Sequence, residues 1–586
     1  MREIYINNFT FFSVFTRFSG NHSSPDNATP PRNQLRQRVK SRSMNATTIY
    51  QARRILTMNA ARPDVSHVAV RDGRILGAGT LDELAAWGPY TLSTQFADKV
   101  LMPGLVEAHS HAMAGSLWRH VYCGYFDVTD PDGRVWPGLR TLEAVIEALG
   151  IAARDSAREA IMGWGFDPIY FSAARCARTD LDRVSMERPV AILHASGHIL
   201  NVNSCALERS GFLRAGIEHP GYPLGADGMP TGELKGPEAM QPVMPCLGLG
   251  PSFLFADEDA LKRFAKLCVN TGVTTATDMA ALLSEDELST MLRVTAGADY
   301  PLRLVPLLRL LGVRPKEAVE RAVALQARGT NQLRLGRIKA VADGSIQGFS
   351  ARVRWPGYFN GSPNGLWYMP PQTLRELYQH ALQSGVQVHT HTNGDEATDM
   401  ALDAMETALR NCGASDHRFT LQHCQLADTA QFRRMRALGM HVNLFANHHF
   451  YWGDQHYATT VGPERAERMN ACRSALREGV PFAIHSDAPI TPLGPLFTAW
   501  CAVNRLTASG RVLGAQERID VADALRAVTL GAAATLKLDG EIGSIECGKR
   551  ADFCVLEADP LAVPPLALKD VRVWGTVQDG RVFQAG

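Results

Sequence analysis

Two histidines separated by one serine end a short apolar stretch of the chain. The stretch reads Leu101-Met-Pro-Gly-Leu-Val-Glu-Ala-His-Ser-His111. Alternate side chains of a β-strand project from the same face, so His109 and His111 would point the same way along one strand. Neutral imidazole is a common metal ligand, and two imidazoles at this spacing could chelate one ion. The pair alone leaves open that two histidines simply fell together at the end of a core strand.

Four further side chains with metal-binding chemistry lie in or directly after later apolar segments. They are Lys339, His391, His423 and Asp487. Each alone fits an ordinary role: a salt-bridged lysine, a core histidine, or a turn or capping aspartate. Together they place a potential ligand at four separate strand ends, in an order that a barrel would bring to one mouth. The joint pattern therefore predicts a metal site.

The elements that must position these groups alternate between helix and strand. Apolar residues at helical spacing predict a helix from Pro371 to Ser384 that ends at Gly385. Strands are predicted at residues 386–389, 418–422, 440–444 and 480–484, with helices from about 396, near 432 and before 479. This repeat favours a (β/α)8 TIM-like barrel, in which catalytic groups lie at the C-terminal strand ends. A doubly wound sheet is the alternative, but no Gly-rich dinucleotide fingerprint follows a strand.

Both ends of the folded chain read instead as short strands separated by turns. We expect residues 47–100 and 536–586 to form one composite β-sandwich domain, flanking a barrel with insertions at residues 101–535. Residues 1–46 are rich in Ser, Asn, Pro and Arg in their second half and are predicted to be a disordered lead-in without a signal peptide. Met1 and Met44 both remain candidates for the start of translation.

Composition excludes several classes of partner. The 586 residues include 60 basic and 59 acidic side chains, so nothing favours a nucleic-acid or membrane-surface partner. No apolar segment approaches the roughly 18 to 20 residues of a membrane span. The 11 cysteines form no C-x-x-C pair, which argues against zinc ribbons and disulfide frameworks and favours a reducing, cytoplasmic location. The expected partner is a small-molecule substrate, and a homo-oligomer is left open.

The order His-x-His, Lys, His, His, Asp resembles the amidohydrolase superfamily of metal-dependent hydrolases, over about residues 49–583. Finer motifs resemble amidohydrolase family 3, the branch that includes N-substituted formamide deformylase. These motifs are Gly163-Trp-Gly-Phe-Asp167, Leu181-Asp-Arg-Val-Ser185 with Arg188-Pro-Val190, Ser196-Gly-His198 with Asn203-Ser-Cys-Ala-Leu207, Lys339-Ala-Val-Ala-Asp-Gly344, and Gly543-Ser-Ile-Glu-Cys-Gly-Lys-Arg-Ala-Asp-Phe553.

The resemblance implies two divalent metals per chain, most plausibly zinc. His109 and His111 would bind the more buried ion, with Asp487 completing that site. His391 and His423 would bind the more exposed ion, and Lys339 would bridge both as a carbamate. A carbamate turns a repelling cation into an anionic oxygen donor. His389, two residues before His391, is interpreted as a neighbour of the site rather than a ligand.

The implied activity is hydrolysis of a carbon–nitrogen bond in a non-peptide amide, such as an N-formyl, N-acyl or cyclic amide, by a metal-bridging hydroxide. Asp487 would act as general base and then as general acid. His198 would steady the oxyanion or serve as a structural hydrogen-bonding group. Residues 213–254 and 448–454 are expected to line the pocket.

Two other functions remain open from the sequence. A single-metal deaminase, or a lactone or ester hydrolase, would use the same groups on the same barrel. A metal-free binding or assembly protein is disfavoured because every potential ligand is present. The sequence does not identify the substrate, the metal or the oligomeric state.

Overall fold

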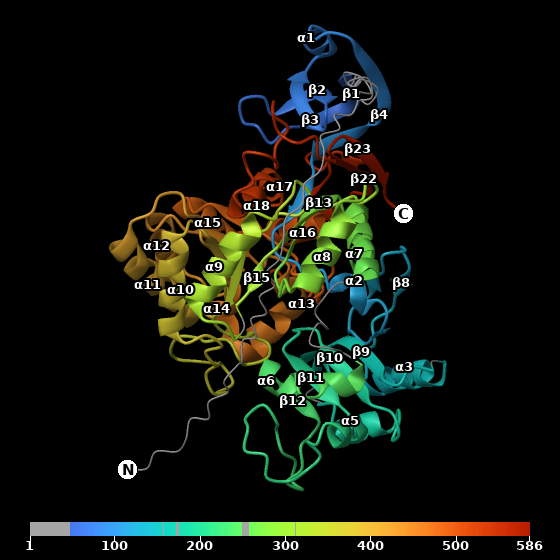
Figure 1. Cartoon of the computed structure of the whole chain (residues 1–586), viewed down its shortest axis with the longest axis vertical. Coiled ribbons are helices and arrows are strands. Elements are labelled where there is room, and N and C mark those ends of the chain that lie inside the picture. Colours follow the sequence, from blue (N-terminus) through green and yellow to red (C-terminus); the bar gives the residue numbers. More distant parts are fainter. Residues whose placement is uncertain (1–46, 156, 172–174, 249–256, 311) are drawn as a thin grey trace, which may run out of the picture. The chain divides into compact units, whose positions relative to one another are not determined.

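The segments that begin at Thr47 and end at Gln584 meet in one sheet of seven strands (Figure 1). The computed structural model describes residues 47–155, 157–171, 175–248, 257–310 and 312–586, and the predicted lead-in lies outside them. The sheet contains β1 (Thr47–Leu56), β2 (Asp64–Arg71), β3 (Arg74–Gly79), β4 (Tyr90–Pro103), β21 (Phe553–Leu556), β22 (Val573–Gln578) and β23 (Arg581–Gln584). Their order is β23-β22-β21-β4-β1-β2-β3, so β21 pairs with β4 and joins the two ends. A second layer, which would make this composite a sandwich, stays a prediction.

The apolar pattern from Leu101 to His111 predicts a single strand, and this prediction is wrong. It divides at Gly104: β4 ends at Pro103, and β5 (Leu105–Glu107) starts in another sheet. The Gly104 N–H donates to the Asp552 carbonyl (2.9 Å), and a Cβ at this position would lie 2.0 Å from Thr274 Oγ1. Because only glycine fits this close approach, the chain changes sheet here, and both histidines follow β5.

Nine parallel strands follow one another in chain order among the described residues, and they occupy eight positions if β14 and β15 are counted as one interrupted strand. One sheet contains β5, β13 (Val273–Asp278) and β14 (Arg303–Pro306). The other contains β15 (Leu308–Arg309), β16 (Arg337–Val341), β17 (Gln387–Thr392), β18 (Thr420–His423), β19 (His441–Leu444) and β20 (Phe482–Ile484). Only Leu307 separates β14 from β15, and a parallel bridge between Ser110 and Ala488 links the segments that follow β5 and β20. The parallel α/β pattern is thus present, and closure as one barrel stays a prediction.

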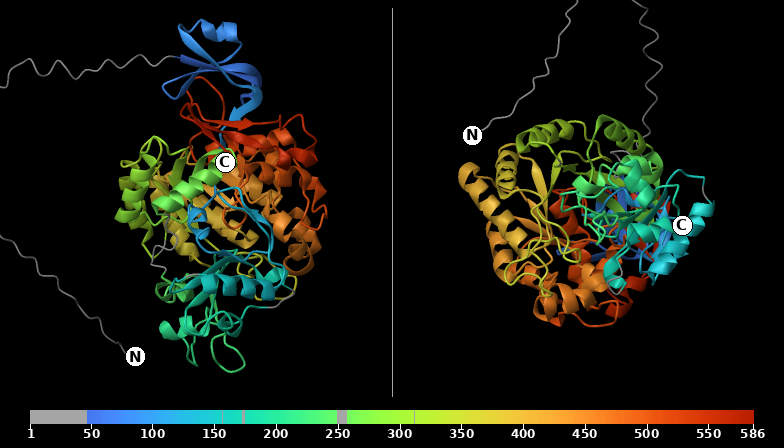
Figure 2. Two further views of the ribbon diagram at one scale, coloured as in Figure 1. Left: turned by 90° about the vertical axis from the view of Figure 1, so that its right-hand side faces the viewer. Right: turned by 90° about the horizontal axis from the view of Figure 1, so that it is seen from below.

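Helices cover the outer side of these strands in both views of Figure 2. They are α7 (Glu258–Asn270), α8 (Glu285–Thr295), α9 (Pro315–Gln326), α10 (Pro371–Gln383), α11 (Asp395–Cys412), α12 (Thr429–Ala437) and α15 (Cys472–Glu478). The predicted helix from residue 371 and those near 396, 432 and 479 are confirmed as α10, α11, α12 and α15. No helix among the described residues is long and apolar enough to cross a membrane.

An additional five-stranded sheet was not anticipated from the sequence. It contains β6 (Val121–Tyr122), β9 (Ile161–Phe166), β10 (Val190–His194), β11 (Ile199–Val202) and β12 (Glu233–Lys235). Helix α3 (Leu142–Asp155) precedes β9 and packs against it. The sheet matters for the site because the turn between β10 and β11 contains His198.

A buried ion pair connects the barrel strands to the composite sheet. Arg303 on β14 is 1% exposed, and its guanidinium donates to the Asp552 carboxylate just before β21. We expect Arg303→Ala to lower the free energy of unfolding by about 3–5 kcal/mol, because Asp552 would remain buried without a cation. Arg119→Ala, which removes exposed pairs with Asp257 and Asp259, should cost about 0–1 kcal/mol. Equal losses for the two variants in chemical unfolding would contradict this role.

Candidate metal centre

The segment between the two histidines is held from both sides. The Ser110 N–H donates to Thr277 Oγ1 (2.9 Å), and the Ser110 hydroxyl donates to the Thr277 carbonyl (2.7 Å) at β13. On the other side the Asp487 N–H donates to the His109 carbonyl (3.1 Å). Ser486 adds its hydroxyl hydrogen bond to Glu107 (2.7 Å) at the end of β5. The His-x-His segment and the Asp487 segment are therefore fixed against each other.

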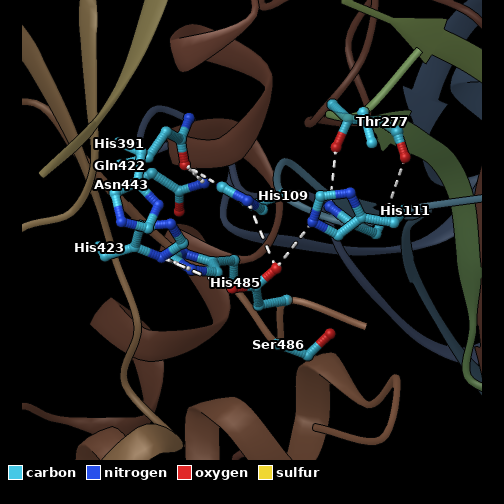
Figure 3. Close-up of polar contacts among 12 residues, drawn as sticks. His109, His111, Thr277, His391, Gln422, His423, Asn443, His485 and Ser486 are labelled. Carbon is cyan, nitrogen blue, oxygen red and sulfur yellow. Dashed lines mark hydrogen bonds and ion pairs between the residues drawn. The ribbon is translucent and has the colours of Figure 1, made fainter. Parts of the chain in front are cut away.

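Asp487 is the point at which the candidate ligands converge. Its Oδ1 lies 3.2 Å from His111 Nε2 and 3.4 Å from His109 Nε2, and its Oδ2 lies 3.7 Å from His423 Nδ1. Lys339, 3% exposed on β16, places Nζ 3.4 Å from His109 Nε2. Figure 3 shows the imidazoles of His109, His111 and His423 gathered in this small space. The structure thus brings five of the six predicted ligands together, three of them around Asp487 and Lys339 beside His109.

His391 and His198 lie in the same cavity but further from Asp487. The His391 ring lies 4.5 Å from the His423 ring, while its Nε2 is 3.2 Å from the Gly344 carbonyl oxygen and 3.6 Å from Asp343 Oδ1. The His198 ring is 6.2 Å from the His391 ring. His391 thus lies beside His423 but outside the two groups of closely spaced ligand atoms, and its role as a ligand stays a prediction, as does the role of His198.

His485 was missed by the sequence reasoning. It directly follows β20, its ring stacks on His109 (4.8 Å between centroids), and its Nε2 lies 3.1 Å from His423 Nδ1. A usable signal was present, since His485 and Asp487 are two residues apart, the spacing that identified His109 and His111. His485 is thus a further candidate ligand.

The Gln422 amide sets which nitrogen of His109 faces the centre. The His109 Nδ1–H donates to Gln422 Oε1 (2.7 Å), and Asn443 Nδ2 donates to the same oxygen (3.0 Å). Gln422 Nε2 in turn donates to Nδ1 of the fully buried His389 (2.7 Å). His109 Nε2 therefore carries the free lone pair toward Asp487, and His389 lies behind the centre as a neighbour.

We expect Gln422→Leu to weaken metal binding by about 10- to 100-fold, because outer-shell partners fix the tautomer and orientation of ligating histidines. Competition with a chromophoric chelator would measure the dissociation constant. Gln372→Leu, on the exposed side of α10, is the matched control and should leave the constant unchanged. An unchanged constant in Gln422→Leu would remove this positioning role.

Burial sets the protonation of the centre. It is the main reason that the pKa values of His109, His391 and His423 lie well below the usual range. Burial lowers the pKa of Lys339 to about 7; the charge of Asp487 opposes this shift, and the charge of Arg309 adds to it. For Asp487 burial alone would raise the pKa, but the hydrogen bond and charge of His111 outweigh it and the pKa is lowered. The imidazoles of His109, His391 and His423 are thus neutral and the Asp487 carboxylate is ionised, which are the forms that bind metal.

These residues fit a divalent metal. Two sets of ligand atoms lie within 4.8 Å of one another among the described residues: those of His109, His111 and Asp487, and those of His109, His423 and His485. His111 Nδ1 is buried without a hydrogen-bond partner. Imidazole nitrogens combined with one carboxylate oxygen form a donor set that suits zinc and similar ions.

A cavity of about 180 Å³ opens beside the ligands. Met240 and Met244, from the segment 213–254, line it as expected; residues 249–254 of that segment lie outside the described residues. His448, which begins α13 (His448–Gln455), also lines it, so both predicted segments contribute. The remaining wall is largely apolar and includes Met279 and Leu282.

Comparisons with known proteins agree with this architecture. The profile of the amidohydrolase family matches residues 97–584. Protein LONG AFTER FAR-RED 3 of Arabidopsis thaliana is 29% identical over 522 residues, covering 86% of each chain. N-substituted formamide deformylase of Arthrobacter pascens is 26% identical and covers 90% of this chain and 96% of its own.

A solved structure shows the same fold. It is an uncharacterised metal-dependent hydrolase from Pyrococcus horikoshii, 20% identical, with a TM-score of 0.68, and it covers 89% of this chain and 99% of its own. At that identity the similarity concerns the fold, and the chemistry rests on the residues described above.

Proposed function

Because the chain belongs to the amidohydrolase family, we propose that it hydrolyses a carbon–nitrogen bond of a non-peptide amide: an N-formyl, N-acyl or cyclic amide. The observation that carries the proposal is the convergence of His109, His111 and His423 on the Asp487 carboxylate beside a cavity. The name of the formamide deformylase relative supports the choice of this bond.

We propose two zinc ions per chain, held by His109, His111 and Asp487 and by His391 and His423, with Lys339 as a bridging carbamate. A divalent metal bound here would lower the pKa of a coordinated water and polarise the substrate carbonyl. The position of Lys339 supports the carbamate, since its amine is buried beside His109 and forms no ion pair with a carboxylate of the described residues. A neutral amine is the form that captures carbon dioxide.

Asp487 moves the proton that the reaction requires. Water adds its oxygen to the carbonyl carbon, the carbon–nitrogen bond breaks, and one proton of the water must reach the leaving nitrogen. The Asp487 carboxylate accepts that proton and returns it to the nitrogen, because an amide cannot expel an unprotonated amide anion at neutral pH. The lowered pKa of Asp487 keeps it ready to accept.

His198, which lines the same cavity, is proposed to contact the carbonyl oxygen of the substrate. Burial, followed by the charge of Arg309, lowers the pKa of His198 to about 4. The neutral imidazole can donate one hydrogen bond to an oxyanion without adding a positive charge near the metals. The Gly236 N–H donates to the His198 carbonyl (2.9 Å), which anchors the turn that carries it.

A screen of zinc-loaded protein against N-formyl amines, N-acyl amines and cyclic amides tests the proposal, with amine release as the readout. Lactones and aminopyrimidines belong in the same screen, because their hydrolysis or deamination would identify the alternative functions. Hydrolysis of at least one amide class, lost in Asp487→Asn, is the expected result. Turnover confined to lactones or aminopyrimidines would refute amide hydrolysis.

A further inference from the structure

Arg309 points into the cavity beside the candidate metal centre. It is the last residue of β15 and pairs in register with Lys339 on the neighbouring parallel strand. Residues paired this way project from the same face of the sheet, and Lys339 projects toward His109. Arg309 accordingly lines the cavity and is half-buried.

The Arg309 guanidinium has no partner among the residues that the structure describes. Among the described residues no carboxylate forms an ion pair with it, and none of its N–H groups donates a hydrogen bond; its backbone N–H alone donates, to the Ala281 carbonyl (2.9 Å). Other half-buried arginines of the protein are paired, for example Arg352 with Glu396 and Arg354 with Asp399. Burying an unpaired cation costs free energy. A bound anion that does not belong to the chain would offset this cost at Arg309.

A second polar group in the same cavity also lacks a partner. Gln347 is 7% exposed, lines the cavity, and its Oε1 is buried without a hydrogen bond among the described residues. Much of the remaining wall is apolar, with Met240, Met244 and Leu282. A mostly apolar wall with a small number of polar groups is typical of sites that orient a small ligand.

We infer that Arg309 binds a carboxylate of the substrate, so that the amide cleaved by this protein carries an anionic group. The inference rests on the proposed function and names its substrate class: an acidic amide with an apolar body, such as an N-formyl or N-acyl amino acid. One guanidinium balances one negative charge and matches the planar carboxylate fork. A phosphate group, with nearly two charges, would need a second cation, and the adjacent Lys339 is assigned to the metals.

The test compares N-formyl derivatives of leucine, methionine and phenylalanine with their methyl esters, which keep the scissile bond and lose the charge. In the zinc-loaded wild type the acids should be preferred by at least tenfold in kcat/KM. Arg309→Gln should lose about 10- to 100-fold on the acids, mainly through KM, and less than threefold on the esters. Arg309→Lys should recover part of this loss, and Arg375→Gln, exposed on α10, should match the wild type.

Calorimetric binding of the same acids and esters separates this inference from the proposed function. If no amide is cleaved, tighter binding of the acids to the wild type, lost in Arg309→Gln, would still support the carboxylate site. Acids that bind less than tenfold tighter than esters would overturn it. The inference would also be overturned if Arg309→Gln lost zinc and lost kcat/KM equally on acids and esters. That result would indicate that the guanidinium pairs with the Lys339 carbamate instead.

Discussion

Replacing Lys339 with alanine should remove bound metal and abolish activity, and formate or acetate should restore part of both. The Lys339 side chain is 3% exposed, and its Nζ lies 3.4 Å from His109 Nε2, so a carbamate there would lie among the ligands. Small carboxylates can supply the missing bridging oxygens. Metal content and activity of Lys339→Ala, measured with and without 100 mM-scale formate, provide the readout.

Lys339→Arg is the decisive companion variant. Arginine stays protonated and would place a permanent cation among ligands that must hold dications, so neither metal nor activity should survive, with or without formate. An ordinary lysine that only formed ion pairs would tolerate the change. Full activity in Lys339→Arg would refute the carbamate and favour a single-metal site on His109, His111, His391 and Asp487.

Asp487→Asn should lower kcat by about 10²- to 10⁴-fold, because the amide cannot accept and return a proton. The variant keeps an oxygen near His109 and His111, so its zinc content should fall less than its activity. The pKa of Asp487 is lowered, and wild-type activity should therefore persist until the pH falls below the ordinary range of a carboxyl group. This acidic limb of the pH profile should be absent from Asp487→Asn.

Asp454→Asn is the matched control for this effect. Asp454 lies on α13 and bonds to Ser509 and Thr507, away from the centre. Its kcat and pH profile should match those of the wild type. A kcat for Asp487→Asn within tenfold of the wild type would remove Asp487 from the proton transfer.

Much of the fold was predictable where apolar periodicity is regular. Helix α10 was predicted from apolar residues at 3.6-residue spacing before Gly385, and strand β17 was predicted from the short apolar run that follows. Both are confirmed. Strand β4 was missed because most of its first nine residues are exposed and polar, so it lacks the alternation of a half-buried strand. The five-stranded sheet was missed because its strands are short and, apart from β10 and β11, are separated by helices and irregular segments.

The candidate site was predictable in its residue types but not in its geometry. His109, His111 and Asp487 could be chosen because several residues with metal-binding side chains at successive strand ends are hard to explain by separate structural roles. His485 was overlooked although it lies two residues before Asp487, the spacing that identified His109 and His111; the structure adds that its ring stacks on that of His109. Arg309 gave no signal at all, because the absence of a counter-ion is a property of the folded cavity.

Elemental analysis of the purified protein measures its metal content. We expect about two divalent ions per chain, namely zinc, with activity lost on chelation and dialysis and regained on adding the ion. A metal content near zero, with full activity after chelation, would contradict the metal centre at His109, His111, Lys339, His391, His423 and Asp487.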